Sequence, residues 1–379
     1  MEFFVGVTGM LDKGEPVDII CIDFQKAFDK VPHQRLCRKL ESHGINGNVL
    51  NWIQGWLKNR KQRVDINGSQ SEWSGVSSGV PQGSVLGPVL FLICINDIDS
   101  AVDTLIKKFA DDTKLYAGIK TEEQARSLQN SLHSVLKWGQ DWQMLFNLNK
   151  CKDLHVGRNN PNVQYFMDGI PLENVTEEKD LGVTVTESFK PSKQCSISAA
   201  KANRILGIIK KTFSSRDSAV IAKLYKSLVR PHLEYAIQAW SPYLQRDIDT
   251  LEKVQRRATK MVEGIEELSY EDRLEYLNLT TLITRRLRGD LIEVFKILKG
   301  TDDLPKEYLF QMRSEDKNRL RGHSFMLETP KARLDIRKNS FSHRIVTEWN
   351  RLPPAVVDAD SVNVFKNRID EHFKNIGLV

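Results

Sequence analysis

Apolar positions in the first half of the chain follow both the strand period and the helix period. The run from Val17 to Ile22 is almost continuously apolar and predicts a buried strand. Residues 105–118 form two short apolar stretches on either side of Asp111-Asp112, which predicts a hairpin. Apolar spacings of three and four residues predict helices at residues 32–43, 48–59, 84–97 and 121–146. This half is therefore expected to be an α+β domain.

The remaining elements divide the chain into three segments. The Asn67-Gly68 turn predicts a second hairpin, and further short strands are expected at residues 152–157, 163–167 and 180–186. From about residue 192 the pattern is helical, with predicted helices at residues 195–213, 216–230, 246–263 and 280–299. The tail shows no clear period. We therefore expect domains at residues 1–190, 191–300 and 301–379.

Charge is distributed unevenly along the 379 residues. Residues 1–190 carry 21 basic and 24 acidic side chains, whereas residues 191–379 carry 34 and 25. The net charge of +6 therefore comes entirely from the second half. Such a distribution suits a polyanion-binding module joined to another domain. A helical domain with solvated basic faces explains the same charges, and charge alone leaves both interpretations open.

The cysteines and the apolar runs limit the class of protein. Five widely separated cysteines, an odd number without C-x-x-C spacing, indicate neither a disulfide framework nor a zinc site. They favour a reducing compartment inside the cell, nuclear or cytoplasmic, over secretion. The longest apolar run, Val89 to Ile95, is too short to span a membrane.

Three carboxylates are candidates for chemistry. Asp23 follows the buried strand, and Asp111 and Asp112 lie at the tip of the hairpin. If the two strands are neighbours, the carboxylates meet at one end of a sheet, where their repulsion favours bound cations. Such oxygen ligands suit Mg²⁺, and a pair of these ions supports phosphoryl transfer. Asp-Asp at a hairpin corner is also ordinary turn chemistry, so these residues alone do not decide.

The segment from Gly79 to Pro88 lies between the carboxylates in the sequence. Gly79 and Gly83 allow close approach of the backbone to a flat ligand, and Gln82 offers an amide donor and acceptor. This composition suits a nucleotide or a template base. The overlapping G-x-S-x-G around Ser77 also raises a serine hydrolase, but that motif requires a buried strand before it and a helix directly after it.

Taken together, three blocks resemble the reverse transcriptases of non-LTR retrotransposons, in the LINE, jockey-like branch. They are Ile22-Asp-Phe-Gln-Lys-Ala-Phe-Asp29, Gly79-Val-Pro-Gln-Gly83 and Phe109-Ala-Asp-Asp112. The similarity continues through Leu145-Phe-Asn-Leu-Asn-Lys-Cys151, Asp180-Leu-Gly-Val183, Leu228-Val-Arg-Pro-His-Leu-Glu-Tyr235, Arg333-Leu-Asp-Ile-Arg-Lys338 and Trp349-Asn-Arg-Leu-Pro353. It thus covers nearly the whole chain. The resemblance implies a right-hand polymerase palm, an antiparallel sheet packed on helices, followed by a mainly helical thumb and C-terminal region.

The resemblance also implies roles for single residues. Asp23 and Asp111 would hold two Mg²⁺ ions, with Mn²⁺ as a substitute, and Asp112 would complete the acidic cluster. The carbonyl of Phe24 would add a backbone ligand. Phe28 would exclude the ribose 2′-hydroxyl, although its type is equally that of a core residue.

Other positions would hold the substrates. Gln82 and Gly83 would line the nucleotide and template pocket. Lys150 would lie near the departing pyrophosphate. The alternative interpretation of Lys150 is an ordinary surface lysine. Val156 and Gly157 would hold the primer end.

The expected partners are an RNA template, a DNA primer and deoxynucleoside triphosphates, with no membrane and no zinc. Basic residues of the helical region would contact phosphates. Candidates are Arg256, Arg257, Arg285, Arg286 and Arg288.

Only 22 residues precede Asp23, fewer than the family's fingers require. The sequence therefore predicts an N-terminally truncated product, or an incomplete gene model, with weak or absent polymerase activity. The alternative is a non-catalytic, retroelement-derived nucleic-acid-binding protein.

Overall fold

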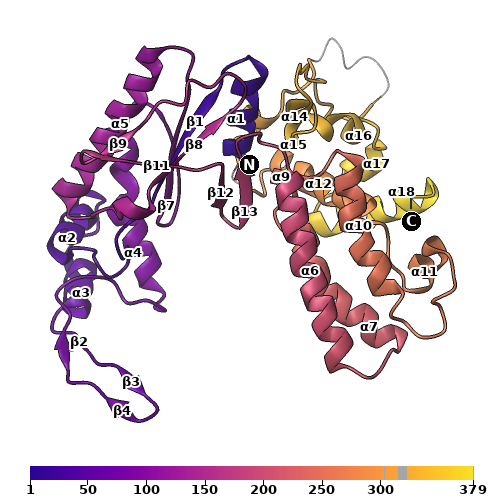
Figure 1. The fold of residues 1–379 in the computed structure, drawn as a ribbon, viewed down its shortest axis with the longest axis horizontal. Helices are drawn as coiled ribbons and strands as arrows, with labels where there is room; N and C mark the ends of the chain where they lie inside the picture. Colours follow the sequence, from indigo (N-terminus) through magenta and orange to yellow (C-terminus); the bar gives the residue numbers. More distant parts are fainter. Residues whose placement is uncertain (303, 315–321, 379) are drawn as a thin grey trace. The chain divides into compact units, whose positions relative to one another are not determined.

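The chain folds into two compact units, Glu15–Glu178 and a second unit that joins Met1–Gly14 to Lys179–Val379 (Figure 1). The computed structural model describes residues 1–302, 304–314 and 322–378. These units differ from the three segments expected from the sequence. The first helix belongs to the second unit, the boundary falls after Glu178, and the remaining residues to Val379 form one unit. The roles assigned to those segments stay predictions.

A five-stranded sheet forms the centre of the unit Glu15–Glu178. Its strand order is β11-β8-β1-β7-β6, and every neighbouring pair is antiparallel except β11 with β8. The strands are β1 (Val17–Ile22), β6 (Leu105–Phe109), β7 (Asp112–Gly118), β8 (Lys152–Val156) and β11 (Glu173–Asn174). The central strand β1 is buried along almost its whole length, which explains its continuous apolar run. The predicted strand and hairpin are therefore confirmed, and they are adjacent.

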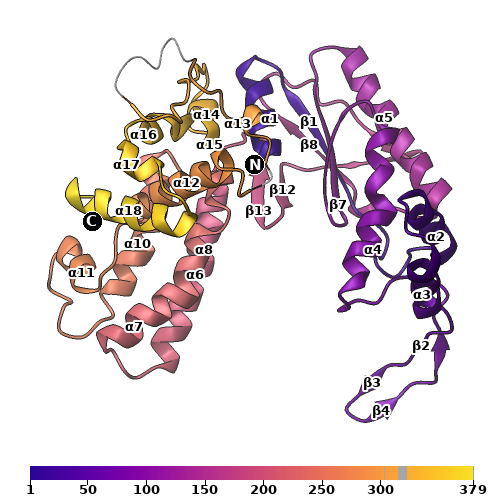
Figure 2. The ribbon, with the colours of Figure 1, turned by 180° about the vertical axis from the view of Figure 1, so that it is seen from behind.

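Helices bury the apolar side chains of this sheet in one core (Figure 2). They are α2 (His33–Ser42), α3 (Gly47–Leu57), α4 (Leu86–Ile95) and α5 (Glu122–Trp142), with a 3₁₀ turn, η1 (Asn96–Ala101), after α4. The longest, α5, begins with a reciprocal capping box between Thr121 and Gln124 and ends at Gln143 in the left-handed conformation. These four helices were predicted to within a few residues.

A buried cation ties three of these elements together. Lys39 on α2 is 4% exposed, and its ammonium pairs with Asp97 in η1. The same ammonium lies 3.7 Å from the ring centroid of Trp142 on α5. Burial lowers the pKa of Lys39, and the contact with Asp97 opposes that effect. Lys39 therefore stabilises the packing of α2 against η1 and α5.

Two narrow ribbons extend the segment between α3 and α4 away from the helices (Figure 1). They pair β2 (Lys61–Gln62) with β5 (Ser74–Gly75), and β3 (Asp65–Ile66) with β4 (Ser69–Gln70). The second ribbon turns at Asn67-Gly68, both at positive φ, as the dipeptide predicts. A third ribbon, β9 (Phe166–Met167) with β10 (Ile170–Pro171), follows β8, as does the β12 (Glu177–Asp180)–β13 (Val183–Thr186) hairpin.

The second unit is largely helical. Its first part comprises α6 (Ser192–Thr212), α7 (Ser218–Leu224), α8 (Arg230–Glu234), α9 (Ile237–Trp240), α10 (Gln245–Thr259), α11 (Tyr270–Tyr276) and α12 (Leu282–Leu298). The single helix expected at residues 216–230 instead contains a π-helical turn, η3 (Tyr225–Val229). The chain then bends where Ala236 has a positive φ of 51°. Periodicity does not reveal either feature, because neither changes the apolar spacing greatly.

The tail is ordered by aromatic packing around α12. Its helices are α13 (Lys306–Leu309), α14 (Asp335–Lys338), α15 (Phe341–Arg344), α16 (Val346–Asn350), α17 (Pro354–Val357) and α18 (Val362–Asn375). Phe295 of α12 stacks on Phe365 of α18 with ring centroids 4.3 Å apart. The N-terminal helix α1 (Glu2–Asp12), not predicted from the sequence, adds Val5 to this core. Five of these helices, α13 to α17, contain only four or five residues, too few to show a helical period in the sequence.

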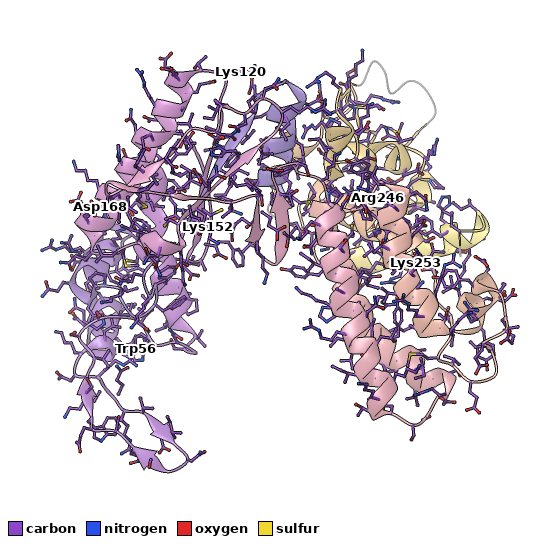
Figure 3. The ribbon with its side chains drawn as sticks, viewed as in Figure 1. Trp56, Lys120, Lys152, Asp168, Arg246 and Lys253 are labelled. Atoms are coloured by element: carbon purple, nitrogen blue, oxygen red, sulfur yellow. The ribbon has the colours of Figure 1, made fainter. Side chains whose placement is uncertain are left out.

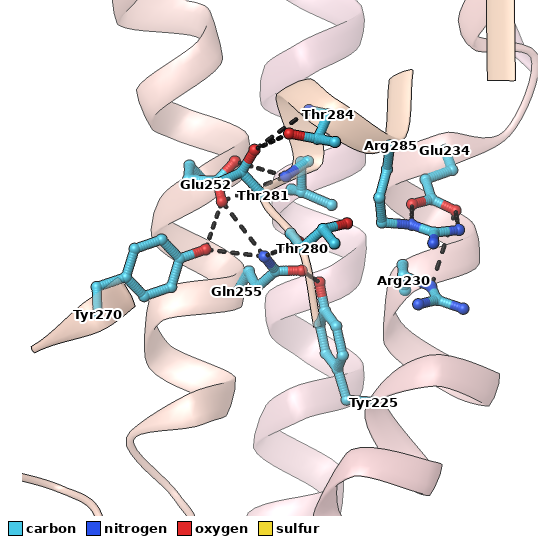
Figure 4. A network of polar contacts seen from close by, with 11 residues as sticks. Tyr225, Arg230, Glu234, Glu252, Gln255, Tyr270, Thr280, Thr281, Thr284 and Arg285 are labelled. Atoms are coloured by element: carbon cyan, nitrogen blue, oxygen red, sulfur yellow. Dashed lines mark hydrogen bonds and ion pairs between the residues drawn. The ribbon is translucent and has the colours of Figure 1, made fainter. Parts of the chain in front are cut away.

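A buried hydrogen-bond network joins α10, α11, α12 and η3 (Figure 4). The carboxylate of Glu252, 7% exposed, accepts from the hydroxyl of Tyr270 and from the backbone N–H of Leu282. Gln255 donates to Tyr270 and accepts from Tyr225, at 2.8 and 2.6 Å. Because buried polar groups are costly unless paired, this network specifies how the helices pack.

A second buried polar cluster lies within the sheet of the first unit. Asp18 and Asp153 are fully buried, and the Nδ1 atom of His155 lies 2.7 Å from Asp18. Tyr165 and Asn160 donate to the same Asp18 carboxylate. Burial lowers the pKa of His155, but its contacts with Asp153 and Asp18 outweigh burial and raise the pKa to about 9. The charged imidazolium therefore stabilises the fold.

This arrangement predicts a loss of stability at alkaline pH. The folded-state pKa of His155 lies above its ordinary value of about 6.5, so its contribution is complete below about pH 6.5 and disappears as the pH rises through about 9. We expect the free energy of unfolding to fall by about 2–3 kcal/mol between pH 6.5 and 9.5. Urea unfolding, monitored by tryptophan fluorescence, measures this free energy at each pH. The fall should persist in His133→Gln, an exposed site on α5, and disappear in His155→Gln; an unchanged profile in the latter contradicts the assignment.

Candidate functional site

The pairing of β1 with β7 brings two carboxylate-bearing segments together. These strands are antiparallel with Ile22 opposite Thr113, so the next residues outward, Asp23 and Asp112, are neighbours across the same pair. Asp111 occupies the two-residue turn between β6 and β7, after Ala110 at a φ of 51°. The convergence expected from the sequence is therefore a consequence of strand register.

Asp23 also contacts the segment that precedes β8. Its side chain is 31% exposed, and one carboxylate oxygen lies 3.3 Å from the Nζ atom of Lys150. The backbone carbonyl of Asp23 accepts from the N–H of Asn147 at 2.8 Å, and Gln25 donates to Leu145 at 2.8 Å. Lys150 thus reaches Asp23 because these two backbone hydrogen bonds hold its segment in place.

Phe24 lies between those two hydrogen bonds. Its ring is 3% exposed and packs on Phe146 with centroids 4.7 Å apart. Neither of the two backbone hydrogen bonds uses the Phe24 carbonyl. The side chain of Phe24 is therefore a core element, and only its carbonyl could serve as a ligand.

The donor set of these carboxylates suits a hard divalent cation, because it consists of oxygen atoms at the solvent-accessible end of two strands. In the described part of the chain, no three His, Cys, Asp or Glu side chains are already gathered closely enough to hold a metal ion. Asp23 is instead paired with Lys150. The residue types and their register fit a cation site.

The Gly79–Gly83 loop packs against the residues that directly follow Asp23. The N–H of Gly79 donates to Val31, and that of Val80 donates to Phe28, both at 2.8 Å. Gly79 has a φ of 90°, and a Cβ atom there would lie 2.7 Å from the carbonyl oxygen of Asp29. Only glycine therefore permits this close approach.

Side chains reinforce the contact between the loop and this segment. The amide of Gln82 donates to the carboxylate of Asp29 at 3.2 Å, and the imidazole of His33 lies 2.8 Å from the Gly79 carbonyl. Gln82 and Gly83 are exposed. Sequence reasoning assigned no role to Asp29 or His33. The only signal was the position of Asp29 within a quoted block.

Phe28, five residues after Asp23, contacts both the loop and helix α4. Its half-buried ring stacks on Phe91 of α4 with centroids 4.8 Å apart and planes 19° from parallel. Its backbone carbonyl accepts from Val80. The ring is thus rigidly held by the core while part of it stays accessible.

Some residues that the resemblance places near the site are elsewhere. Val156 pairs with Val17, at the end of β1 opposite Asp23, so Val156 and Gly157 do not adjoin the carboxylates. Five residues of extended strand separate the two ends, or about 17 Å.

Of the five candidate phosphate-binding arginines, two form ion pairs and a third is buried. Arg285 forms a two-point ion pair with Glu234, and Arg288 pairs with Asp370. Arg286 is 5% exposed. The packing of α12 therefore does not favour phosphate contacts at these three positions, and such contacts stay a prediction.

The other two arginines belong to an exposed basic face of α10. Arg256, Arg257 and Lys260 lie on the side opposite the buried Leu251 and Val254, as the apolar spacing predicted. Arg246 and Lys253 project from the same helix (Figure 3). This face is accessible to a polyanion.

The serine hydrolase alternative is contradicted by the surroundings of Ser77. The strand before it, β5, contains only two residues, both exposed, and α4 begins as late as Leu86. A nucleophile elbow requires a buried strand and an immediate helix. Separately, the described residues include no helix both long enough and apolar enough to cross a membrane.

Comparison with known proteins identifies the family. The family model "Reverse transcriptase (RNA-dependent DNA polymerase)" matches residues 9–208, more than half of the chain. The RNA-directed DNA polymerase from mobile element jockey of Drosophila funebris is 30% identical over 273 residues, covering 67% of this chain and 29% of that protein. The probable polymerase from transposon X-element of Drosophila melanogaster is 24% identical, with the same two coverages.

A more distant relative and two solved structures complete the comparison. The Pol polyprotein of retrotransposable element R2 from Popillia japonica is 25% identical over 46% of this chain and 32% of its own. Telomerases from Candida albicans and Candida tropicalis are 14% and 10% identical, each with a TM-score of 0.40. They cover 81% and 70% of this chain and 50% and 45% of theirs, and at these TM-scores the likeness supports no inference.

The match covers the strand that ends at Asp23, the Gly79 loop and the hairpin that carries Asp111 and Asp112. The chain spans less than a third of the length of the jockey and X-element polymerases. The chain belongs to the reverse transcriptase family, and its relatives there are RNA-directed DNA polymerases of non-LTR retrotransposons.

Proposed function

We propose that the chain catalyses RNA-templated addition of deoxynucleotides to a primer 3′-hydroxyl. The observation that carries this proposal is the β1–β7 register, which makes Asp23 a neighbour of the Asp111-Asp112 turn within a reverse transcriptase domain. Asp23, Asp111 and Asp112 would hold two Mg²⁺ ions, or Mn²⁺, with the Phe24 carbonyl as a further ligand. Bound there, such ions activate the attacking hydroxyl and stabilise the leaving oxygen.

The other residues of the site position the substrates. Phe28, held by its stack on Phe91, would occupy the space that a ribose 2′-hydroxyl requires and so favour deoxynucleotides. Gln82 and Gly83 would contact the nucleotide and the template base. The ammonium of Lys150 lies beside Asp23. There it would donate a proton to the departing pyrophosphate or stabilise its negative charge.

The proposed partners are an RNA template, a DNA primer and deoxynucleoside triphosphates. The exposed basic face of α10 supports phosphate contacts in the helical unit. The five cysteines are all free, which supports a reducing compartment inside the cell, nuclear or cytoplasmic.

The same basic face favours a second candidate, a nucleic-acid-binding protein without catalysis. Salt-dependent binding that is unaffected by Asp111→Asn, in a chain that extends no primer, would support this candidate over the first.

The carboxylates are tested by primer extension. With a DNA primer annealed to RNA, Mg²⁺ and deoxynucleotides, we expect Asp23→Asn or Asp111→Asn to reduce extension about a thousandfold or more, because neutral amides hold divalent cations poorly. Primer–template affinity should be unchanged. Asp168→Asn is the matched control, since Asp168 is an exposed turn aspartate between β9 and β10 (Figure 3). Equal extension by Asp111→Asn and wild type would overturn the assignment.

The role proposed for Phe28 is tested by comparing the incorporation of deoxynucleotides with that of ribonucleotides. Phe28→Val opens the space over Phe91, so the ratio of kcat/KM for a deoxynucleotide to that for the matching ribonucleotide should fall about tenfold or more. Single-nucleotide incorporation measures this ratio. Phe166→Ala, which removes an exposed phenylalanine from β9, should leave it unchanged. An unaltered ratio in Phe28→Val would assign Phe28 to the core alone.

Substitutions of two glycines in the loop distinguish the effect of a steric clash from the effect of backbone strain. Gly79→Ala and Gly83→Ala both place a Cβ at positive φ, but only at position 79 would that Cβ meet the Asp29 backbone. We expect Gly79→Ala to reduce extension at least about tenfold more than Gly83→Ala, because the loop must move away from Asp29. Thermal unfolding should show whether each variant is folded. Equal effects of the two substitutions would mean that the close approach is unimportant.

A further inference from the structure

Helix α3 and the ribbon that follows it each expose an indole ring that belongs to no hydrophobic core cluster. Trp52 on α3 and Trp73 before β5 are each 58% exposed. Val64 and Ile66 on the ribbon are 60% and 66% exposed. We call residues 52–76 the ribbon surface. Exposed aromatic and apolar side chains gathered in this way indicate a binding surface.

The ribbon surface also gathers unpaired positive charge. Lys58, Arg60, Lys61 and Arg63 fall within six residues that contain no acid. Within the described parts of the chain, none of these four cations forms an ion pair. Some cations elsewhere in the same unit are paired, at Lys108–Asp99, Lys120–Glu15 and Lys152–Glu178. The charge of this surface is therefore available to a ligand, although residues 1–190 as a whole are net acidic.

Two of the cations on the ribbon surface lie over aromatic rings. Continuing the β2–β5 register places Arg63 opposite Trp73, and its guanidinium lies 4.7 Å from that ring centroid. At the base of the ribbon, the guanidinium of Arg60 lies 5.8 Å from the Trp56 ring, which is near-parallel to Trp52. Trp56 lies where α3 leads into the ribbon (Figure 3). The ribbon surface thus carries two cation–ring pairs, whose arginines are three residues apart along the chain.

We propose that the ribbon surface binds a single-stranded segment of RNA, separately from the carboxylate site. Unpaired bases stack on exposed indoles while Lys and Arg contact successive phosphates. A duplex has no free base faces for the two indoles. A protein partner would not require four uncompensated cations within six residues. The choice of RNA over other single strands rests on the proposed function, in which RNA is the template.

Binding of a labelled 12-nucleotide single-stranded RNA by the full chain tests this proposal. Fluorescence anisotropy is measured without deoxynucleotides and with EDTA, so that polymerisation plays no part. Trp73→Ala should weaken binding about tenfold, and Trp73→Phe should restore most of the affinity. Arg60→Ala with Arg63→Ala should also weaken binding and reduce the salt-dependence slope by about 1.4. The matched control is Arg126→Ala with Lys137→Ala, which removes two exposed cations from α5.

Several results would overturn the proposal. One is an RNA affinity that is unchanged in both ribbon variants, or that falls equally in the α5 control. Another is a loss of affinity that affects only single-stranded DNA or duplex competitors. A third is a variant that changes only the self-association of the protein. The outcome is separable from the proposed function. If the ribbon variants lose RNA binding in a chain that extends no primer, this inference stands and the polymerase proposal fails. If they extend primers with full RNA affinity, this inference alone fails.

Discussion

The antiparallel pairing of β1 with β7 is the constraint on which the candidate site depends. A fixed register makes Asp23 a neighbour of the Asp111-Asp112 turn, although 88 residues separate Asp23 from Asp111 in the sequence. A slip of one residue would turn every side chain of β1 to the other face of the sheet and bury the carboxylate. Such a slip is costly because it would separate the buried Asp18 from its partners His155, Tyr165 and Asn160. The core therefore determines where the carboxylates meet.

The two ends of β1 carry different polar chemistry. At its start, Asp18 is fully buried and compensated by His155, Tyr165 and Asn160, so its charge contributes to stability. Just past its other end, Asp23 is partly exposed and contacts the solvent-exposed Lys150. The first group fixes the pairing of β1 with β8, and the second is accessible to a ligand. Substitutions near β1 therefore have to be judged by which end they affect.

Sequence reasoning predicted the strand, the hairpin and most helices because each has a strong period or a definite turn dipeptide. It placed Asp23, Asp111 and Asp112 at strand ends, and the resemblance of three sequence blocks singled them out as candidate ligands, a role that stays a prediction. It could not find the contact of Gln82 with Asp29, because that contact depends on how the Gly79 loop folds back on the chain. It also could not tell that Arg285 and Arg288 are paired, since their partners are 51 and 82 residues away. Periodicity indicates which face of a helix is polar, and tertiary packing decides whether that face is free.

The central claim is that carboxylates from two distant segments form one cation site. Iron-mediated cleavage tests it most directly, because Fe²⁺ bound in place of Mg²⁺ generates hydroxyl radicals that cut the nearby backbone. With ascorbate and peroxide, the account predicts cuts near both Asp23 and Asp111. Excess Mg²⁺ should suppress both cuts together, and Asp111→Asn should abolish both. Cleavage at one segment alone, or cuts at both that do not depend on Asp111, would contradict it.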